Sequence, residues 1–182
     1  MRIKDREFDE FISEADIEAR VQALARQIDR DYAIEPRAEP PVLVAVLNGA
    51  FVFMADLARS LGVPAEFTFI KVKSYQNMQS TGQHKEFIGL EVPLRDRDVI
   101  IVEDIVDSGN TIRYLSQQFS GQAPRSLAVA TLLFKPQALR HDLKLNYVGF
   151  EIPNDFVVGY GLDYDGLGRN LRSIYRLTVD EA

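Results

Sequence analysis

The stretch "VIIVEDIVDSGNTI", residues 99–112, runs from four apolar residues into two adjacent acids and then into a Ser-Gly-Asn-Thr turn. Residues 99–102 are four consecutive β-branched residues, a run typical of a strand buried on both faces of a parallel sheet. A glycine turn follows, and a helix is expected to begin near Asn110. Ligands of open α/β sheets bind beyond the carboxyl ends of the strands. Glu103 and Asp104 follow the run directly, so they lie where a site is expected.

Strands and helices alternate along the rest of the chain. Ile17, Val21, Leu24 and Ile28 recur at spacings of four, three and four, which predicts an amphipathic helix. Ser13 precedes this helix in a capping pattern. A further helix is expected over residues 50–61, and strands are expected at residues 42–47, 65–73, 86–92, 127–134, 147–152, 156–162 and 173–179. Because several of these strands are apolar throughout, the predicted fold class is α/β, with a central, mainly parallel sheet flanked by helices.

Composition limits the classes of function. The chain has 182 residues, about one domain's length, and its 46% hydrophobic content is that of a globular protein. A net charge of −6 disfavours binding along a nucleic-acid backbone. The absence of cysteine excludes disulfides, thiolate catalysis and cysteine-type zinc sites. With no long apolar run and a charged N-terminus, we expect a cytoplasmic protein that binds neither nucleic acid nor membrane.

The turn after the acids has the features of an anion site. Backbone N–H groups of a turn and a helix start bind phosphate, and Gly109 lets the backbone come close to it. Ser108 and Thr111 add hydroxyl donors. The simpler alternative is a solvated strand end at which Asp107 or Ser108 only caps the helix. Three acids with Ser-Gly-Asn-Thr within nine residues favour a binding site, and a sugar phosphate has the matching polarity.

Other motifs are absent or incomplete. The chain has no G-x-x-x-x-G-K-[ST] phosphate loop, and the dinucleotide fingerprint fails because Tyr164 stands where its third glycine is needed. The segment that begins at Asp163 resembles a calcium loop, but Ile174 occupies the position that requires an acid. His84 and His141 are in no zinc or triad pattern, so both are interpreted as surface residues.

With these residues identified, the chain resembles the hypoxanthine-guanine phosphoribosyltransferases. "VEDIVDSGNT" is similar to their phosphoribosyl-pyrophosphate motif, which a wider class of phosphoribosyltransferases shares. "VGFEIPNDFVVGYGLDY", residues 148–164, points to the purine-salvage branch. The similarity extends from about residue 42 to residue 164. It implies the type I phosphoribosyltransferase fold, with residues 1–182 as a single domain and a small hood formed from the N-terminal and C-terminal segments.

The resemblance implies a reaction and roles for the acids. The phosphoribosyl group of 5-phosphoribosyl 1-pyrophosphate is transferred to hypoxanthine or guanine with Mg²⁺, which gives IMP or GMP and pyrophosphate. Glu103 and Asp104 would hold the ribose hydroxyls, and Asp107 would be the general base that takes a proton from the purine. The resemblance implies that the Mg²⁺ ion is held by Glu103, Asp104 and Asp163. The cradle of the 5-phosphate would comprise Asp107, Ser108, Gly109, Asn110 and Thr111.

Further positions match the family near the purine and the pyrophosphate. Lys135 matches the donor to the purine's 6-oxygen, and Phe156 matches the aromatic residue that stacks on the base. Val157 matches a residue that contacts the base through its backbone. Asp163 matches a magnesium-associated acid, and Arg169 matches a pyrophosphate-binding arginine.

Two loops of this chain also match loops of the family. Asn48 and Gly49 match the family's pyrophosphate loop, in which a non-proline cis peptide bond is implied. The family commonly has lysine where this chain has Asn48, so backbone N–H groups remain as the expected pyrophosphate donors. Ser74 and Tyr75 match the start of the family's mobile lid, and the polar segment 74–85 is expected to be that loop.

Alternatives to this enzyme stay open at the level of sequence. Some proteins with this fold act as nucleotide-sensing regulators that bind RNA or DNA, and others transfer phosphoribose to a different base. The acidic net charge and the presence of the matched positions favour the 6-oxopurine enzyme. The resemblance suggests a homodimer or homotetramer, and it does not rank hypoxanthine, guanine and xanthine.

Overall fold

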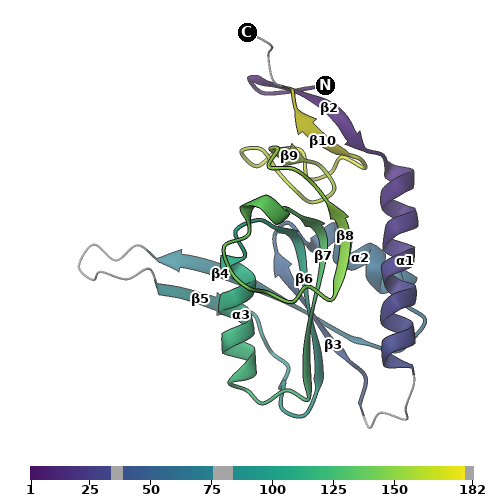
Figure 1. Cartoon of the computed structure of the whole chain (residues 1–182), viewed down its shortest axis with the longest axis vertical. Helices are drawn as coiled ribbons and strands as arrows, with labels where there is room; N and C mark the ends of the chain where they lie inside the picture. Colours follow the sequence, from purple (N-terminus) through teal and green to yellow (C-terminus); the bar gives the residue numbers. More distant parts are fainter. Residues whose placement is uncertain (34–38, 76–83, 179–182) are drawn as a thin grey trace.

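A six-stranded sheet forms the centre of the molecule in the computed structural model, which describes residues 1–33, 39–75 and 84–178 (Figure 1). Its strand order is β5-β4-β3-β6-β7-β8, and every neighbouring pair is parallel except β4 and β5. The bounds are β3 Val42–Leu47, β4 Glu66–Tyr75, β5 His84–Ile88, β6 Asp98–Val106, β7 Ser126–Phe134 and β8 Tyr147–Glu151. The predicted mainly parallel α/β fold is therefore confirmed.

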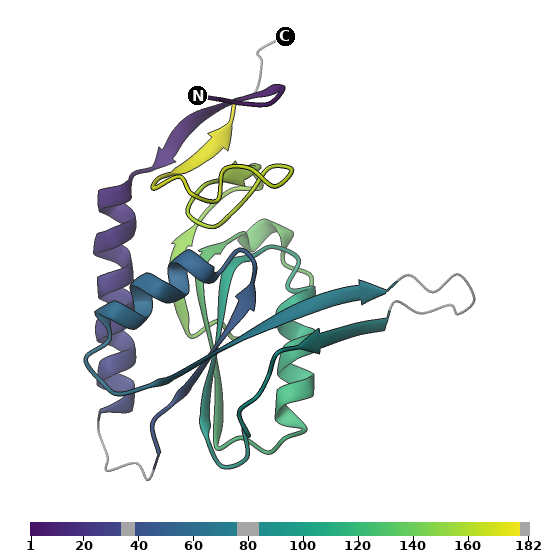
Figure 2. The ribbon, with the colours of Figure 1, turned by 180° about the vertical axis from the view of Figure 1, so that it is seen from behind.

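Helices cover both faces of this sheet (Figures 1 and 2). α1 (Glu14–Tyr32) and α2 (Phe51–Ser60) pack on one face, and α3 (Asn110–Ser120) packs on the other. The predicted cap of α1 is confirmed, because the backbone N–H of Asp16 donates to the Ser13 hydroxyl at 3.2 Å. Within the described ranges, no helix is both long enough and apolar enough to cross a bilayer.

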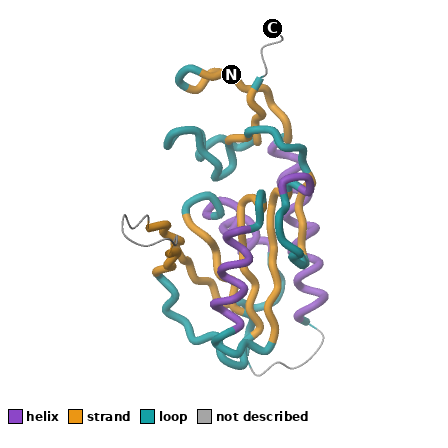
Figure 3. Tube along the Cα trace, turned by 60° about the vertical axis from the view of Figure 1, so that its left-hand side comes forward, coloured by secondary structure: helices purple, strands orange, loops and turns teal. Residues whose placement is uncertain are grey.

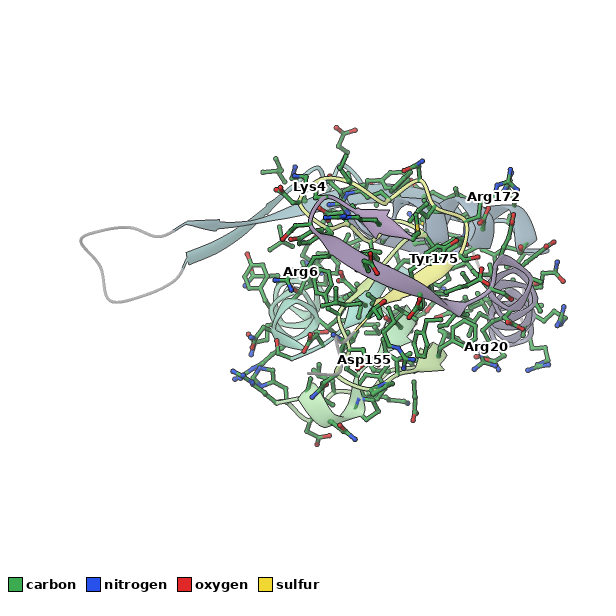
Figure 4. All side chains as sticks on the ribbon, turned by 90° about the horizontal axis from the view of Figure 1, so that it is seen from above. Lys4, Arg6, Arg20, Asp155, Arg172 and Tyr175 are labelled. Carbon is green, nitrogen blue, oxygen red and sulfur yellow. The ribbon has the colours of Figure 1, made fainter. Side chains whose placement is uncertain are left out.

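A second, smaller sheet is built from both ends of the chain. Its strand order is β1-β2-β10-β9, with bounds β1 Arg2–Ile3, β2 Arg6–Ile12, β10 Ile174–Leu177 and β9 Val157–Val158. It lies beyond the end of the main sheet at which the parallel strands finish (Figure 3). Seen from above, β2 and β10 lie across the molecule between α3 and the start of α1 (Figure 4).

Three expectations about strands are corrected by the structure. The strand expected over residues 86–92 ends at Ile88, where Gly89 takes a positive φ of 101°. The strand expected over residues 156–162 stops at Val158, because the next three residues all take positive φ, with φ values of 101° for Gly159, 49° for Tyr160 and 100° for Gly161. The strand that leads into the acids is longer than expected, since β6 continues through Glu103 and Asp104 to Val106.

The loop expected over residues 74–85 is shorter than predicted. β4 continues to Tyr75, and β5 begins at His84, with Ser74 paired to Lys85 and Tyr75 to His84. The two strands form a hairpin that extends away from the body of the molecule (Figure 1). The central part of the expected lid, residues 76–83, lies outside the described residues.

Candidate active site

The turn between β6 and α3 forms a small pocket. Gly109 takes the left-handed conformation with φ 79°, and α3 begins at Asn110, as predicted. A cavity of about 90 Å³ is lined by Glu103 and residues 105–112. A Cβ on Gly109 would lie 2.6 Å from Leu143 Cδ1 and 2.9 Å from Leu139 Cδ1, so these two side chains pack closely on the turn, and the positive φ is what favours glycine here.

Of the two adjacent acids near the end of β6, Glu103 is buried and Asp104 is half-buried. No described residue hydrogen-bonds the Oε2 of Glu103. Burial, followed by the negative charge of Asp104, raises the pKa of Glu103 well above its ordinary value. Burial also raises the pKa of Asp104. A cation or sugar hydroxyls placed here would relieve this desolvation.

The loop after β3 lies against the acids and against the turn after β9. The Leu47–Asn48 peptide bond is cis, as the resemblance implied. A Cβ on Gly49 would lie 1.5 Å from Asp104 Oδ2. A Cβ on Gly161 would lie 2.0 Å from the Gly49 carbonyl oxygen. Two glycines from distant parts of the chain therefore let the two loops touch beside Asp104.

Arg169 reaches the same place from the C-terminal side. Its Nη1 donates to the Gly161 carbonyl at 2.7 Å, and its guanidinium pairs with the carboxylate of Asp163. The positive charge of Arg169 also acts to lower the pKa of Asp104, although burial outweighs it. The structure thus brings Asn48 and Gly49 together with Asp104 and Arg169.

Lys135 lies beside the acidic turn. It follows β7 directly, and its backbone N–H donates to the Val106 carbonyl at 2.9 Å. Lys135 is buried, and its Nζ lies 3.4 Å from Oδ2 of the exposed Asp107. A buried ammonium and an exposed carboxylate therefore lie together at the mouth of the turn.

Phe156 belongs to an aromatic group of the small sheet. Its ring is 46% exposed, and its centroid lies 6.4 Å from that of Phe8 and 5.9 Å from that of Tyr164. The backbone of Val157 pairs with Arg176 in the β9–β10 ladder. An exposed ring with aromatic support on one side can stack on a flat ligand.

The predicted three-acid metal set is not assembled as a cluster. Among the described residues, no three acid or histidine side chains come together to form a metal site. The carboxylate of Asp163 instead forms an ion pair with Arg169 and accepts a hydrogen bond from the backbone N–H of Gly166 at 2.7 Å. Glu103 and Asp104 remain as adjacent desolvated carboxylates. They fit Mg²⁺, which proteins commonly hold through one or two carboxylates together with substrate phosphates.

Ser74 and Tyr75 are the last two residues of β4. Both lie in the part of β4 that projects with β5 from the body of the molecule (Figure 2).

Two supporting contacts at the site were not predicted from the sequence. The Tyr160 hydroxyl donates to Asp56 Oδ2 at 2.6 Å and ties the turn after β9 to α2, and burial raises the pKa of Tyr160. The segment Leu139–Leu143, which follows the 3-10 helix η1 (Pro136–Ala138), packs on Gly109. Neither contact has a local motif, because each joins segments that are distant in sequence.

Comparisons with known proteins agree with this geometry. The model of the phosphoribosyl transferase domain matches residues 9–165. The chain is 46% identical over 161 residues to a hypoxanthine-guanine phosphoribosyltransferase from Mycobacterium tuberculosis, covering 87% of this chain and 80% of the relative. It is 44% identical over 169 residues to a hypoxanthine phosphoribosyltransferase from Salmonella typhimurium, covering 92% and 94%.

The chain belongs to the hypoxanthine-guanine phosphoribosyltransferase family. Solved structures of the family share its fold. A hypoxanthine phosphoribosyltransferase from Trypanosoma cruzi aligns with a TM-score of 0.87 at 36% identity, over 97% of both chains. A hypoxanthine-guanine phosphoribosyltransferase from Bacillus anthracis aligns with a TM-score of 0.82 at 38% identity, over 96% of this chain and 99% of the other. The resemblance and the type I phosphoribosyltransferase fold are confirmed.

Proposed function

We propose that this phosphoribosyltransferase acts in purine salvage, transferring the phosphoribosyl group of 5-phosphoribosyl 1-pyrophosphate to hypoxanthine or guanine. The products are IMP or GMP and pyrophosphate. The observation that carries the proposal is the arrangement at the carboxyl end of β6. There, the buried Glu103 and a glycine turn that opens a helix line one small pocket, and the buried Lys135 lies 3.4 Å from Asp107 of the same turn.

The sugar phosphate fits this pocket with one orientation. The 5-phosphate is held at the turn formed by residues 107–111, where the start of α3 presents backbone N–H groups. The ribose hydroxyls face Glu103 and Asp104. The pyrophosphate lies between the loop at Asn48 and Gly49 and the guanidinium of Arg169. Mg²⁺ would be held by the acid pair and would neutralise the charge of the pyrophosphate.

The chemistry then follows from the side chains. A ring nitrogen of the purine forms a bond to C1 of the ribose while the bond from C1 to the pyrophosphate oxygen breaks. Asp107 takes the proton from nitrogen 7 of the purine as general base. Positive charge that develops on the sugar ring is stabilised by the carboxylates of Glu103 and Asp104.

The purine is selected by Lys135. Its ammonium has only donors, so the substituent at carbon 6 of the base must accept a hydrogen bond. Hypoxanthine and guanine present a carbonyl oxygen at this position. Phe156 stacks on the base, and the backbone at Val157 contacts its edge.

The small sheet and the hairpin of β4 and β5 belong to the same single domain, which comprises residues 1–182. The small sheet serves as the hood over the site, because it carries Phe156 and Val157 on one of its strands or next to it. The hairpin that contains Ser74 and Tyr75 carries the lid. The enzyme acts in the cytoplasm as a homodimer or homotetramer.

Pyrophosphate release tests this proposal. The purified chain is incubated with phosphoribosyl pyrophosphate, Mg²⁺ and each of hypoxanthine, guanine and xanthine, and a gel shift with RNA and DNA is run in parallel. We expect base-dependent pyrophosphate release and no gel shift. A gel shift without turnover would support a nucleotide-sensing regulator, and turnover with another base alone would support a different phosphoribosyltransferase.

A further inference from the structure

The segment Leu139–Leu143 supports the phosphate-binding turn from its outer side. Leu139 and Leu143 fill the space where a Cβ of Gly109 would lie. The backbone N–H of Arg140 donates to the Ser108 carbonyl at 3.2 Å. This segment connects η1, next to Lys135, to β8, so it belongs to neither strand of the pocket and yet touches the turn at several points.

His141 makes the polar contact between this segment and the start of α3. Its Nε2 lies 2.6 Å from Asn110 Oδ1, and its Nδ1 lies 3.1 Å from Arg113 Nη1. An amide oxygen only accepts hydrogen bonds and a guanidinium only donates them. Nε2 therefore carries the hydrogen and donates to Asn110, while Nδ1 accepts from Arg113. One imidazole thus joins two residues of the first turn of α3.

We propose that His141 is a positioning residue for the phosphate-binding turn, which it holds through Asn110. This inference rests on the proposed role of residues 107–111 as the cradle of the 5-phosphate. Asn110 is the first residue of α3, so its side chain fixes the orientation of the helix start whose N–H groups meet the phosphate. His141 itself does not touch the reacting atoms.

The effect should appear in the binding of phosphoribosyl pyrophosphate and not in the purine step. In His141→Phe the aromatic ring is kept and both nitrogens are lost, whereas His141→Gln keeps one donor and one acceptor on one side chain. We expect the Phe variant to raise the KM for phosphoribosyl pyrophosphate about three- to tenfold, the range for losing partly exposed hydrogen bonds. The Gln variant should stay within about twofold of the parent.

Two further variants serve as references. Thr111→Val removes a hydroxyl from the proposed cradle and should also raise the KM for phosphoribosyl pyrophosphate. Gln117→Ala changes an exposed neutral side chain of α3 farther along the helix and should leave both KM values unchanged. For each variant, KM is measured for phosphoribosyl pyrophosphate and for hypoxanthine, together with kcat and a thermal melting curve.

The outcomes separate the inference from the function on which it rests. An increase confined to phosphoribosyl pyrophosphate in the Phe variant, with rescue by Gln, supports the positioning role. If His141→Phe leaves the KM for phosphoribosyl pyrophosphate unchanged while Thr111→Val raises it, only the role of His141 is overturned. Equal impairment of Phe and Gln, or a parallel rise in the hypoxanthine KM, assigns His141 to general packing and overturns the inference. An unchanged Thr111→Val overturns the cradle and the inference together.

Discussion

Replacing Gly49 by alanine should disable the site without unfolding the protein. The added Cβ would lie 1.5 Å from Asp104 Oδ2 and 2.4 Å from its Cγ, whereas ordinary van der Waals contact begins at 3.4 Å. The Asp104 carboxylate therefore has to move by about 2 Å. Misplacement of a reacting group by about 1 Å can cost about 10²-fold in rate. Gly49 is not among the residues with positive φ, so alanine itself is tolerated by the backbone.

We expect kcat/KM for phosphoribosyl pyrophosphate to fall at least about 10²-fold in Gly49→Ala, a loss of about 2.7 kcal/mol in transition-state stabilisation. The assay is the initial rate of nucleotide formation at saturating hypoxanthine, with circular dichroism melting to verify the fold. Gly121→Ala is the matched control, because Gly121 has φ −64° and a Cβ there would lie no closer than 3.4 Å to Gln118 O. A folded Gly49→Ala variant with activity close to the parent would refute the reasoning that Asp104 must occupy its present position.

Three further predictions concern single side chains. Asp107→Asn removes the proposed base and should lower kcat with guanine about 10²–10⁴-fold, and a loss under about fivefold would make Asp107 only a helix cap. Since burial raises the pKa of Glu103 in the folded chain, ionisation of Glu103 destabilises the fold as pH rises above the unfolded value of about 4.3. The melting temperature of Glu103→Gln relative to the parent should therefore increase from pH 5 to pH 8, and a difference independent of pH would contradict this. Tyr160→Phe leaves Asp56 without a hydroxyl donor and should cost about 1 kcal/mol, or about 2–4 °C in melting temperature; an unchanged melting curve would show that this bond does not anchor the turn.

Most of the main sheet was predictable, because its strands are short apolar runs and their order alternates with helices. The small sheet was only partly predictable. In β2, "REFDEFI", four of the seven residues are charged and only Phe8 and Ile12 are buried, so the strand resembles a charged terminus. Its partner β10 lies at the other end of the chain, and this pairing leaves no local pattern.

The candidate active site was likewise only partly predictable from the sequence. Residues 103–111 are adjacent in sequence, and the chemistry of that stretch is legible as a strand end, a turn and a helix start. The contacts of Gly49 with Gly161, of Asp56 with Tyr160 and of His141 with Asn110 each join loops that meet only after folding. No spacing rule connects such loops. The resemblance identified Gly49, whereas the contacts of Gly161 and His141 are evident only in the folded structure.

We propose that Lys135 makes this enzyme specific for 6-oxopurines. The most direct test is initial-rate kinetics with hypoxanthine, guanine and adenine at fixed phosphoribosyl pyrophosphate and Mg²⁺. Adenine would place an amine donor against the buried ammonium of Lys135, at a cost of about 2–5 kcal/mol from breaking a buried charged hydrogen bond. That cost corresponds to a factor of about 30 to several thousand in kcat/KM. We predict turnover of hypoxanthine and guanine with adenine lower by that factor, and adenine within about tenfold of hypoxanthine would contradict the account.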